Sequence, residues 1–151
     1  MAGLRLVVRI ALFTGLLLAM ASWALTLLTS AFPGNWVGVL SAAQPLAGLA
    51  VFGWLGWRLG RQSGSAVWGA LAGVLAGAFF ALLTAVPELY VIAPTRILLS
   101  GGAKLTAVLL AVLLTALFAG VVGLVGGSLG AGQRGRRMVD SDPIADPGKE
   151  G

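Results

Sequence analysis

Four long apolar stretches constrain this sequence more than any other feature. They cover residues 10–28, 36–57, 66–86 and 105–129, and each is close to or above the roughly 20 apolar residues that cross a hydrocarbon core as a helix. With 58% of its residues hydrophobic and 10% charged, a chain of 151 residues cannot hide this much apolar surface in a water-soluble core. The sequence therefore predicts an all-α membrane protein with four transmembrane helices, located in the cell membrane.

The first apolar stretch can also be read as a secretory signal peptide, because Arg5 and Arg9 give it a basic start. Its apolar region is longer than the roughly 7 to 15 residues of such a signal. No clear small-x-small cleavage site precedes the polar segment SAFPGN at residues 30–35. We therefore expect a retained helix, with a cleaved signal as the alternative.

The Lys and Arg residues predict the orientation of the helices, because both are retained on the cytoplasmic side of short loops. If both termini are cytoplasmic, only Arg96 and Lys104 lie outside, and the remaining basic residues lie inside: Arg5, Arg9, Arg58, Arg61, Arg134, Arg136, Arg137 and Lys149. The aromatic belts agree, with Trp36 and Tyr90 outside and an inner group of Trp54, Trp57 and Trp68. We expect cytoplasmic amino and carboxyl termini.

Two segments differ in composition from the helices. Residues 138–151 are acidic, contain two prolines and have no apolar periodicity, so we expect a disordered cytoplasmic tail after a four-helix transmembrane domain at 1–137. Residues 87–103 contain the apolar strings LYVIAP and ILLS, which water does not favour. That segment is expected to lie in the membrane interface or to re-enter the bundle.

Glycine recurs at helical spacing inside the predicted helices. In GALAGVLAGAF, residues 69–79, it occupies every fourth position. Helices in a bilayer associate by close van der Waals contact, and small residues at this spacing let two backbones approach each other. The pattern predicts a Gly/Ala-packed bundle, or glycine zipper, whose helix-packing residues are Gly53, Gly56, Gly60, Gly69, Gly73, Gly77, Gly120, Gly123 and Gly127. The first helix offers its own small face at Gly15, Ala19, Ser22 and Thr26.

Two octapeptides share the pattern G-x-x-G-x-x-L-G. They are GWLGWRLG at residues 53–60 and GLVGGSLG at residues 123–130, near the ends of the second and fourth predicted helices. One interpretation is a duplication that gives two parallel helical-hairpin repeats about an axis along the membrane normal. The other is chance within a low-complexity alphabet.

The longer run GWLGWRLGRQSGSAVWGALAG, residues 53–73, carries a family resemblance together with the final GLVGGSLG. A glycine-rich helix end, an Arg-containing turn and a Trp-Gly restart make the chain similar to the uncharacterised YrzE-like small four-helix integral membrane proteins of bacteria. The resemblance implies four transmembrane helices. It implies no activity and supplies no catalytic or binding residues.

The residues that enzymes use most often are scarce in this sequence. There is no histidine and no cysteine, which removes the commonest general base, the commonest metal ligand and any disulfide. The string GGSLG at residues 126–130 matches a nucleophile elbow but lacks the strand and the histidine that an elbow needs. Glu88 is the one acid near the predicted spans. We expect no enzymatic activity, no metal and no cofactor.

Polar residues near the outer ends of the helices form a candidate crevice, made of Gln44, Thr84, Glu88 and Arg96. Pro45 removes a helical hydrogen bond beside Gln44, and the amide of Gln44 needs a polar partner inside the bundle. One interpretation is structural, with Gln44 bonded to a Ser or Thr of a neighbouring helix. The other is a contact for a solute or an ion.

Two classes of function follow from these observations. The first is a non-enzymatic integral membrane protein that acts through helix packing, as a homo-oligomer or as an accessory subunit of a membrane complex. The alternative is a small-solute or ion transporter or channel with an outward-facing polar crevice near Gln44. The basic residues stand singly or in pairs beside apolar runs, so we expect the lipid bilayer and another membrane protein, and no nucleic acid, as partners.

Overall fold

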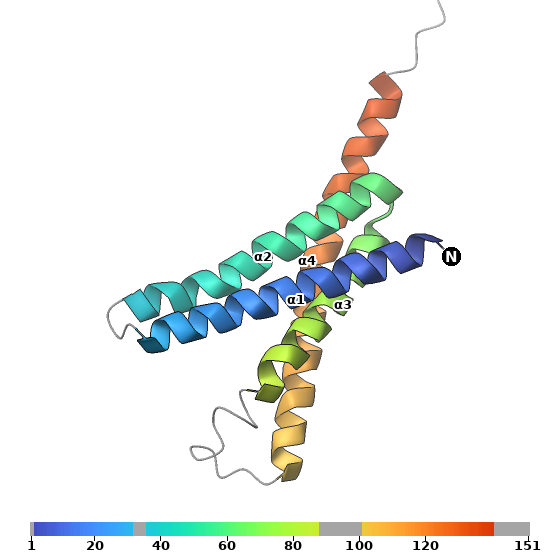
Figure 1. Ribbon diagram of the computed structural model, residues 1–151. Helices are drawn as coiled ribbons and strands as arrows, with labels where there is room; N and C mark the ends of the chain where they lie inside the picture. The colour runs from blue at the N-terminus through green and yellow to red at the C-terminus, as the bar shows by residue number, and fades with distance from the viewer. Residues whose placement is uncertain (1, 32–35, 88–100, 141–151) are drawn as a thin grey trace, which may run out of the picture.

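The computed structural model of the chain describes residues 2–31, 36–87 and 101–140, with the side chains at 2–3, 36–37, 40–42 and 134–140 excepted. Over these ranges the chain forms four α-helices: α1 (Ala2–Ala31), α2 (Trp36–Ser63), α3 (Ala66–Pro87) and α4 (Gly101–Asp140) (Figure 1). Each of the four predicted ranges lies inside one of these helices. The prediction of an all-helical protein with four helices is confirmed.

Three helical stretches of the described chain are long and apolar enough to cross a membrane: Leu4–Ala31, Ala66–Pro87 and Gly101–Gln133. The fourth helix, α2, is not among them. The side chains at 36–37 and 40–42 of α2 are not described, and the continuous described part, residues 43–63, contains Gln44, Pro45, Arg58 and Arg61, which lower its hydropathy. The structure therefore supports three membrane-spanning helices, and the span at residues 36–57 stays a prediction.

Helices α1 and α4 extend beyond the apolar stretches that predicted them. α1 already begins at Ala2, and α4 continues to Asp140. The apolar pattern ends at the first charged residues, whereas helical hydrogen bonding continues through arginine, which is a good helix former. The predicted tail beyond Asp140 and most of the predicted interfacial segment, residues 88–100, lie outside the described residues.

A tight turn at Gly64 joins α2 to α3. Gly64 has a φ of 73°, in the left-handed region that glycine adopts without the steric cost of a side chain. Its N–H donates to the carbonyl of Gly60 at 2.8 Å and so closes the last turn of α2. The hydroxyl of Ser63 donates to Leu59 O at 2.7 Å and accepts from the N–H of Ser65 at 3.2 Å. This turn fixes where α3 starts relative to α2.

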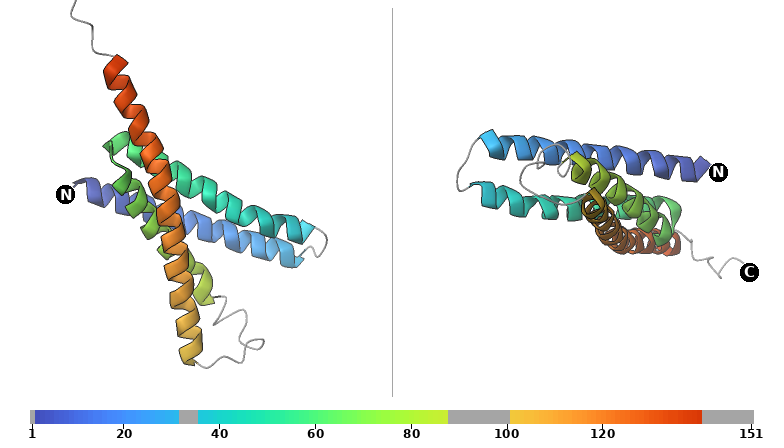
Figure 2. Two further views of the ribbon diagram at one scale, coloured as in Figure 1. Left: turned by 180° about the vertical axis from the view of Figure 1, so that it is seen from behind. Right: turned by 90° about the horizontal axis from the view of Figure 1, so that it is seen from below.

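The helices form two antiparallel pairs that cross steeply. α1 lies beside α2, and α3 lies beside α4, and the two pairs make an X in Figure 1 and in the left view of Figure 2. Helix α4 packs mainly on α3 and α2, whereas α1 packs mainly on α3 and has little contact with α2. The helix ends joined by residues 32–35 point away from the α3–α4 pair (Figure 2).

The core at the crossing is built mostly from small side chains. Its buried residues are Val7, Ala11, Phe52, Leu55, Leu59, Ala72, Ala76 and Ala119. Leu55 is the largest side chain that is fully buried. With so little side-chain volume between them, the helix backbones come close together, and the apolar side chains on the outer surfaces are left to face the surroundings.

Candidate functional site

Helices α2 and α4 touch through their glycines. A Cβ added at Gly56 would overlap the carbonyl of Gly123, and one at Gly60 would overlap the carbonyl of Gly127. Residue numbers increase in the same direction along both helices at this contact, so α2 and α4 run in the same sense where they cross. Only residues without a side chain fit at these four positions, because backbone lies directly opposite each of them.

The two G-x-x-G-x-x-L-G octapeptides are therefore contact partners. The fourth and eighth positions of the pattern are Gly56 and Gly60 in the first octapeptide and Gly126 and Gly130 in the second. A Cβ at Gly56 or Gly60 would meet the backbone of α4, and a Cβ at Gly126 or Gly130 would meet the backbone of Gly53 or Trp57 on α2. Two parallel helices that approach to backbone contact require glycine at the same helical spacing on both sides. This requirement accounts for the shared pattern without a duplication.

Helices α3 and α4 pack by the same means in the antiparallel sense. Gly69 lies against Gly123, and Gly73 lies against the backbone of Ala119. A Cβ at Gly77 would come within 2.6 Å of the Cβ of Ala119. The small faces of α2 and α3 thus both pack on α4.

The remaining predicted packing glycines have looser surroundings. Gly120 faces the side chain of Val74, where an added Cβ would lie 2.6 Å from Val74 Cγ2, and Gly53 has ordinary contact with Val122 at 3.7 Å. Two close contacts lie outside the predicted packing set: Gly126 lies against the backbone of Gly53, and Gly130 lies against the backbone of Trp57. Their spacing, three residues after Gly123 and three residues after Gly127, was the signal that could have identified them.

Helix α1 packs through a stripe of four-residue period. Val7, Ala11, Gly15 and Ala19 are buried, and a Cβ at Gly15 would lie 2.8 Å from the carbonyl oxygen of Ala76 on α3. Further along α1, Ser22 is half-buried and Thr26 is exposed. The expected small face of α1 therefore packs closely only up to Ala19, and beyond it the helix pairs diverge.

This divergence opens an apolar cleft between the two helix pairs, with a volume of about 450 Å³. All four helices contribute to its walls, which are formed by Leu18, Ala21, Ser22, Leu25, Gln44, Pro45, Ala47, Gly48, Phe52, Phe80, Thr115 and Phe118. Gln44 Nε2 donates a hydrogen bond to Ser22 Oγ at 2.7 Å, which links α2 to α1. The cleft thus combines large apolar walls with one polar pair, a combination common in ligand and helix-binding sites.

Of the predicted crevice residues, Gln44 alone lines this cleft among those that the structure describes. The hydroxyl of Thr84 donates to Phe80 O at 3.0 Å in its own helix, so its hydrogen bond is local. Glu88 and Arg96 lie outside the described residues. The structure brings Gln44 together with Ser22 of α1, in agreement with the structural interpretation, in which Gln44 bonds to a Ser or Thr of a neighbouring helix.

Nothing in the described part of the chain offers a metal site, since no three His, Cys, Asp or Glu side chains gather there. No protein-family model matches the sequence, and no curated protein and no solved structure matches it at a significant level. The resemblance to YrzE-like proteins stays an expectation, and the contacts of this chain carry the functional argument.

Proposed function

We propose that this chain is a four-span integral membrane protein with both termini in the cytoplasm. Helix α2 would be the fourth span because it packs along α4 with backbone contact at Gly56 and Gly60, and α4 is apolar enough to cross a membrane. A helix in backbone contact with a spanning helix, and running in the same sense, would cross the same bilayer with a different tilt. The amino end of α1 and the carboxyl end of α2 lie on the same side of the crossing, which fits the positions of Arg5, Arg9 and Arg58 (Figure 1).

The steep crossing is compatible with such a membrane placement. The 30 residues of α1 make a helix about 45 Å long, well above a hydrocarbon core of about 30 Å. A helix that exceeds the core accommodates the difference by tilting. The α1–α2 pair can therefore tilt strongly and still begin and end at the interfaces, whereas the 22 residues of α3, about 33 Å, keep the α3–α4 pair closer to the membrane normal.

The proposed function is that of a non-enzymatic accessory subunit that receives a transmembrane helix of another membrane protein in its apolar cleft. The observation that carries this proposal is the placement of Gln44 in that cleft. Gln44 follows Trp36 by eight residues, or about 12 Å along the helix, which puts its exposed amide well inside the hydrocarbon core. An amide facing acyl chains is unfavourable, and a hydrogen bond across to another helix removes much of that cost.

One N–H of Gln44 is committed to Ser22, and an amide has a second N–H and a carbonyl oxygen with which to bond a partner. The small faces of α2, α3 and α4 are already in contact with one another. We therefore place the assembly surface at the cleft and not on the glycine stripes.

The transporter alternative has less support from the cleft. Its lining residues include no charged side chain among those described, and its walls are largely leucine, alanine and phenylalanine. Such walls suit an apolar occupant better than a hydrated ion. A lipid-soluble small molecule is the occupant that remains as the competing outcome of the test.

Photo-crosslinking from two alanines of α1 tests the proposal. Ala21 and Ala24 are both exposed on the same helix, but only Ala21 lines the cleft. A photoreactive residue at position 21 should trap a discrete membrane protein in native membranes, and one at position 24 should not. Equal trapping at both positions, or trapping of lipid alone at position 21, would overturn the proposed function.

A further inference from the structure

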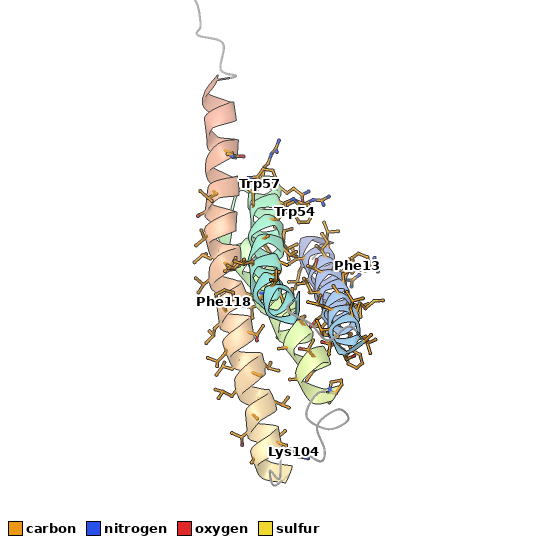
Figure 3. All side chains as sticks on the ribbon, turned by 90° about the vertical axis from the view of Figure 1, so that its left-hand side faces the viewer. Phe13, Trp54, Trp57, Lys104 and Phe118 are labelled. Atoms are coloured by element: carbon orange, nitrogen blue, oxygen red, sulfur yellow. The ribbon has the colours of Figure 1, made fainter. Side chains whose placement is uncertain are left out.

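The cytoplasmic end of α2, as oriented above, carries two arginine–tryptophan stacks. The guanidinium of Arg58 lies 5.3 Å from the centre of the Trp54 ring, and that of Arg61 lies 5.5 Å from the centre of the Trp57 ring. Both separations are within the range of cation–π attraction. The indole N–H of Trp57 also donates to Gln133 Oε1 on α4 at 3.3 Å. Figure 3 shows both tryptophans near this end of α2.

These stacks line a polar hollow of about 390 Å³, formed by Trp54, Trp57, Arg58, Arg61 and Gln62. Two guanidinium groups, each held over an aromatic ring, present planar sets of N–H donors that match the oxygens of a phosphate group. Among the side chains that the structure describes, none is acidic, so no described carboxylate competes with a phosphate for these two arginines.

An apolar groove of about 500 Å³ continues from this hollow between α2 and α4. It is lined by Leu49, Gly53, Trp54, Trp57, Val121, Val122, Val125, Gly126 and Leu129. Trp54 and Trp57 belong to both sites, so they form the boundary between the basic hollow and the apolar groove. The glycines at positions 53 and 126 add no side-chain volume to the groove walls.

The groove has the length of one membrane leaflet. Leu49 precedes Arg58 by nine residues, which is about 14 Å along α2. Half of a hydrocarbon core of about 30 Å is about 15 Å. With the arginines at the headgroup level and α2 tilted, the groove therefore runs from the interface into the hydrocarbon region of one leaflet.

We infer that the hollow and the groove together bind one anionic phospholipid. Its phosphate is held by Arg58 and Arg61, and one acyl chain lies in the groove against Val121, Val125 and Leu129. Charge complementarity selects an anionic headgroup, and the continuous apolar wall selects a lipid over a free phosphate. This site lies apart from the cleft around Gln44 and does not depend on the proposed partner helix.

Native mass spectrometry of the full-length protein in non-ionic detergent tests this inference. Phosphatidylglycerol and phosphatidylcholine with identical acyl chains are added in equal amounts. The unmodified protein should retain phosphatidylglycerol preferentially, and Arg58→Gln and Arg61→Gln should each reduce that preference about fivefold, the equivalent of about 1 kcal/mol per basic residue near an anionic surface. Arg5→Gln and Arg9→Gln, which remove charges that are also exposed from α1, should leave it unchanged.

A second pair of variants tests the groove. Val125→Phe fills part of the groove and should lower the retention of phosphatidylglycerol. The control is Val67→Phe, at an exposed valine of α3 that lines none of the pockets described above, and it should leave the retention unchanged. Glycerophosphoglycerol, the headgroup without chains, should fail to displace the bound lipid at equal concentration. Equal retention of the two lipids, an equal effect of the α1 arginines, or displacement by the free headgroup would each overturn the inference.

Discussion

Gly69 and Gly123 face each other so closely that a Cβ on either one would meet the carbonyl oxygen of the other. Gly56 of α2 completes the contact, because its Cα lies 3.1 Å from the Cβ position of Gly69. Helices α2, α3 and α4 therefore meet at one point without any intervening side chain. This junction holds the crossed helix pairs in place.

Replacing Gly123 with alanine should destabilise the protein, because the added methyl group meets the backbone of Gly69 and Gly73 on α3. Overpacking of this kind costs about 1–3 kcal/mol when the surroundings cannot move aside. We expect a lower free energy of unfolding for Gly123→Ala, measured by titration with a denaturing detergent in mixed micelles. Gly132→Ala is the matched control, since nothing lies within 4 Å of a Cβ at that position in the same helix. Equal unfolding curves for the two variants would show that the junction is looser than described.

The bond from Gln44 to Ser22 is expected to couple α2 to α1. Interhelical hydrogen bonds in membranes are worth about 0.6–2 kcal/mol, and here α1 and α2 have few other contacts. In a double-mutant cycle with Gln44→Leu and Ser22→Ala, the effects on the free energy of unfolding should be non-additive by that amount.

Thr106→Val serves as the reference for this cycle, because the Thr106 hydroxyl donates to Gly102 O within its own helix at 3.0 Å. Combined with Gln44→Leu, it should give additive effects. Additivity in the Gln44–Ser22 cycle as well would mean that this hydrogen bond adds nothing to stability.

The turn at Gly64 requires a left-handed backbone conformation. Gly64→Ala should cost about 1–2 kcal/mol in the free energy of unfolding, because a Cβ at a φ of 73° crowds the following carbonyl. Gly64→Asn should cost less, since asparagine tolerates this region better. The reverse order of the two variants in thermal unfolding would rule out backbone strain as the cause.

The proposed topology is open to a direct test because the sequence contains no cysteine. Single cysteines at Gly101 and Gly132 lie in the same helix, and both positions have open space around the added side chain. A membrane-impermeant maleimide added to intact cells should label Gly101→Cys, at the outer end of α4, and leave Gly132→Cys unlabelled until the cells are permeabilised. The opposite labelling pattern would invert the orientation.

The helices were predictable from the sequence because each apolar stretch is long and nearly uninterrupted. The same is not true of the way the helices pair. Gly56, Gly69 and Gly123 share a spacing that signals close approach, but that spacing does not say which helix approaches which. The choice of α4 as the shared partner depends on the steep crossing, which is a property of the whole bundle and not of any one helix.

The cleft was predictable only in part, for a similar reason. A glutamine next to a proline in an apolar stretch indicates an unusual position, and Gln44 does line the cleft. The sequence groups Thr84 with it because both lie near the outer end of a helix, but the Thr84 hydroxyl bonds to its own helix. The walls formed by Phe80 and Phe118 carry no sequence signal that separates them from ordinary lipid-facing side chains.

Native mass spectrometry of the protein extracted gently from its own membrane tests the central claim most directly. The account predicts a complex in which one further membrane protein stays bound to the unmodified chain. That complex should be lost in Ala21→Trp, which fills the cleft, and kept in Ala24→Trp, which does not. An unmodified chain that is released as a monomer with no other protein bound would contradict the account.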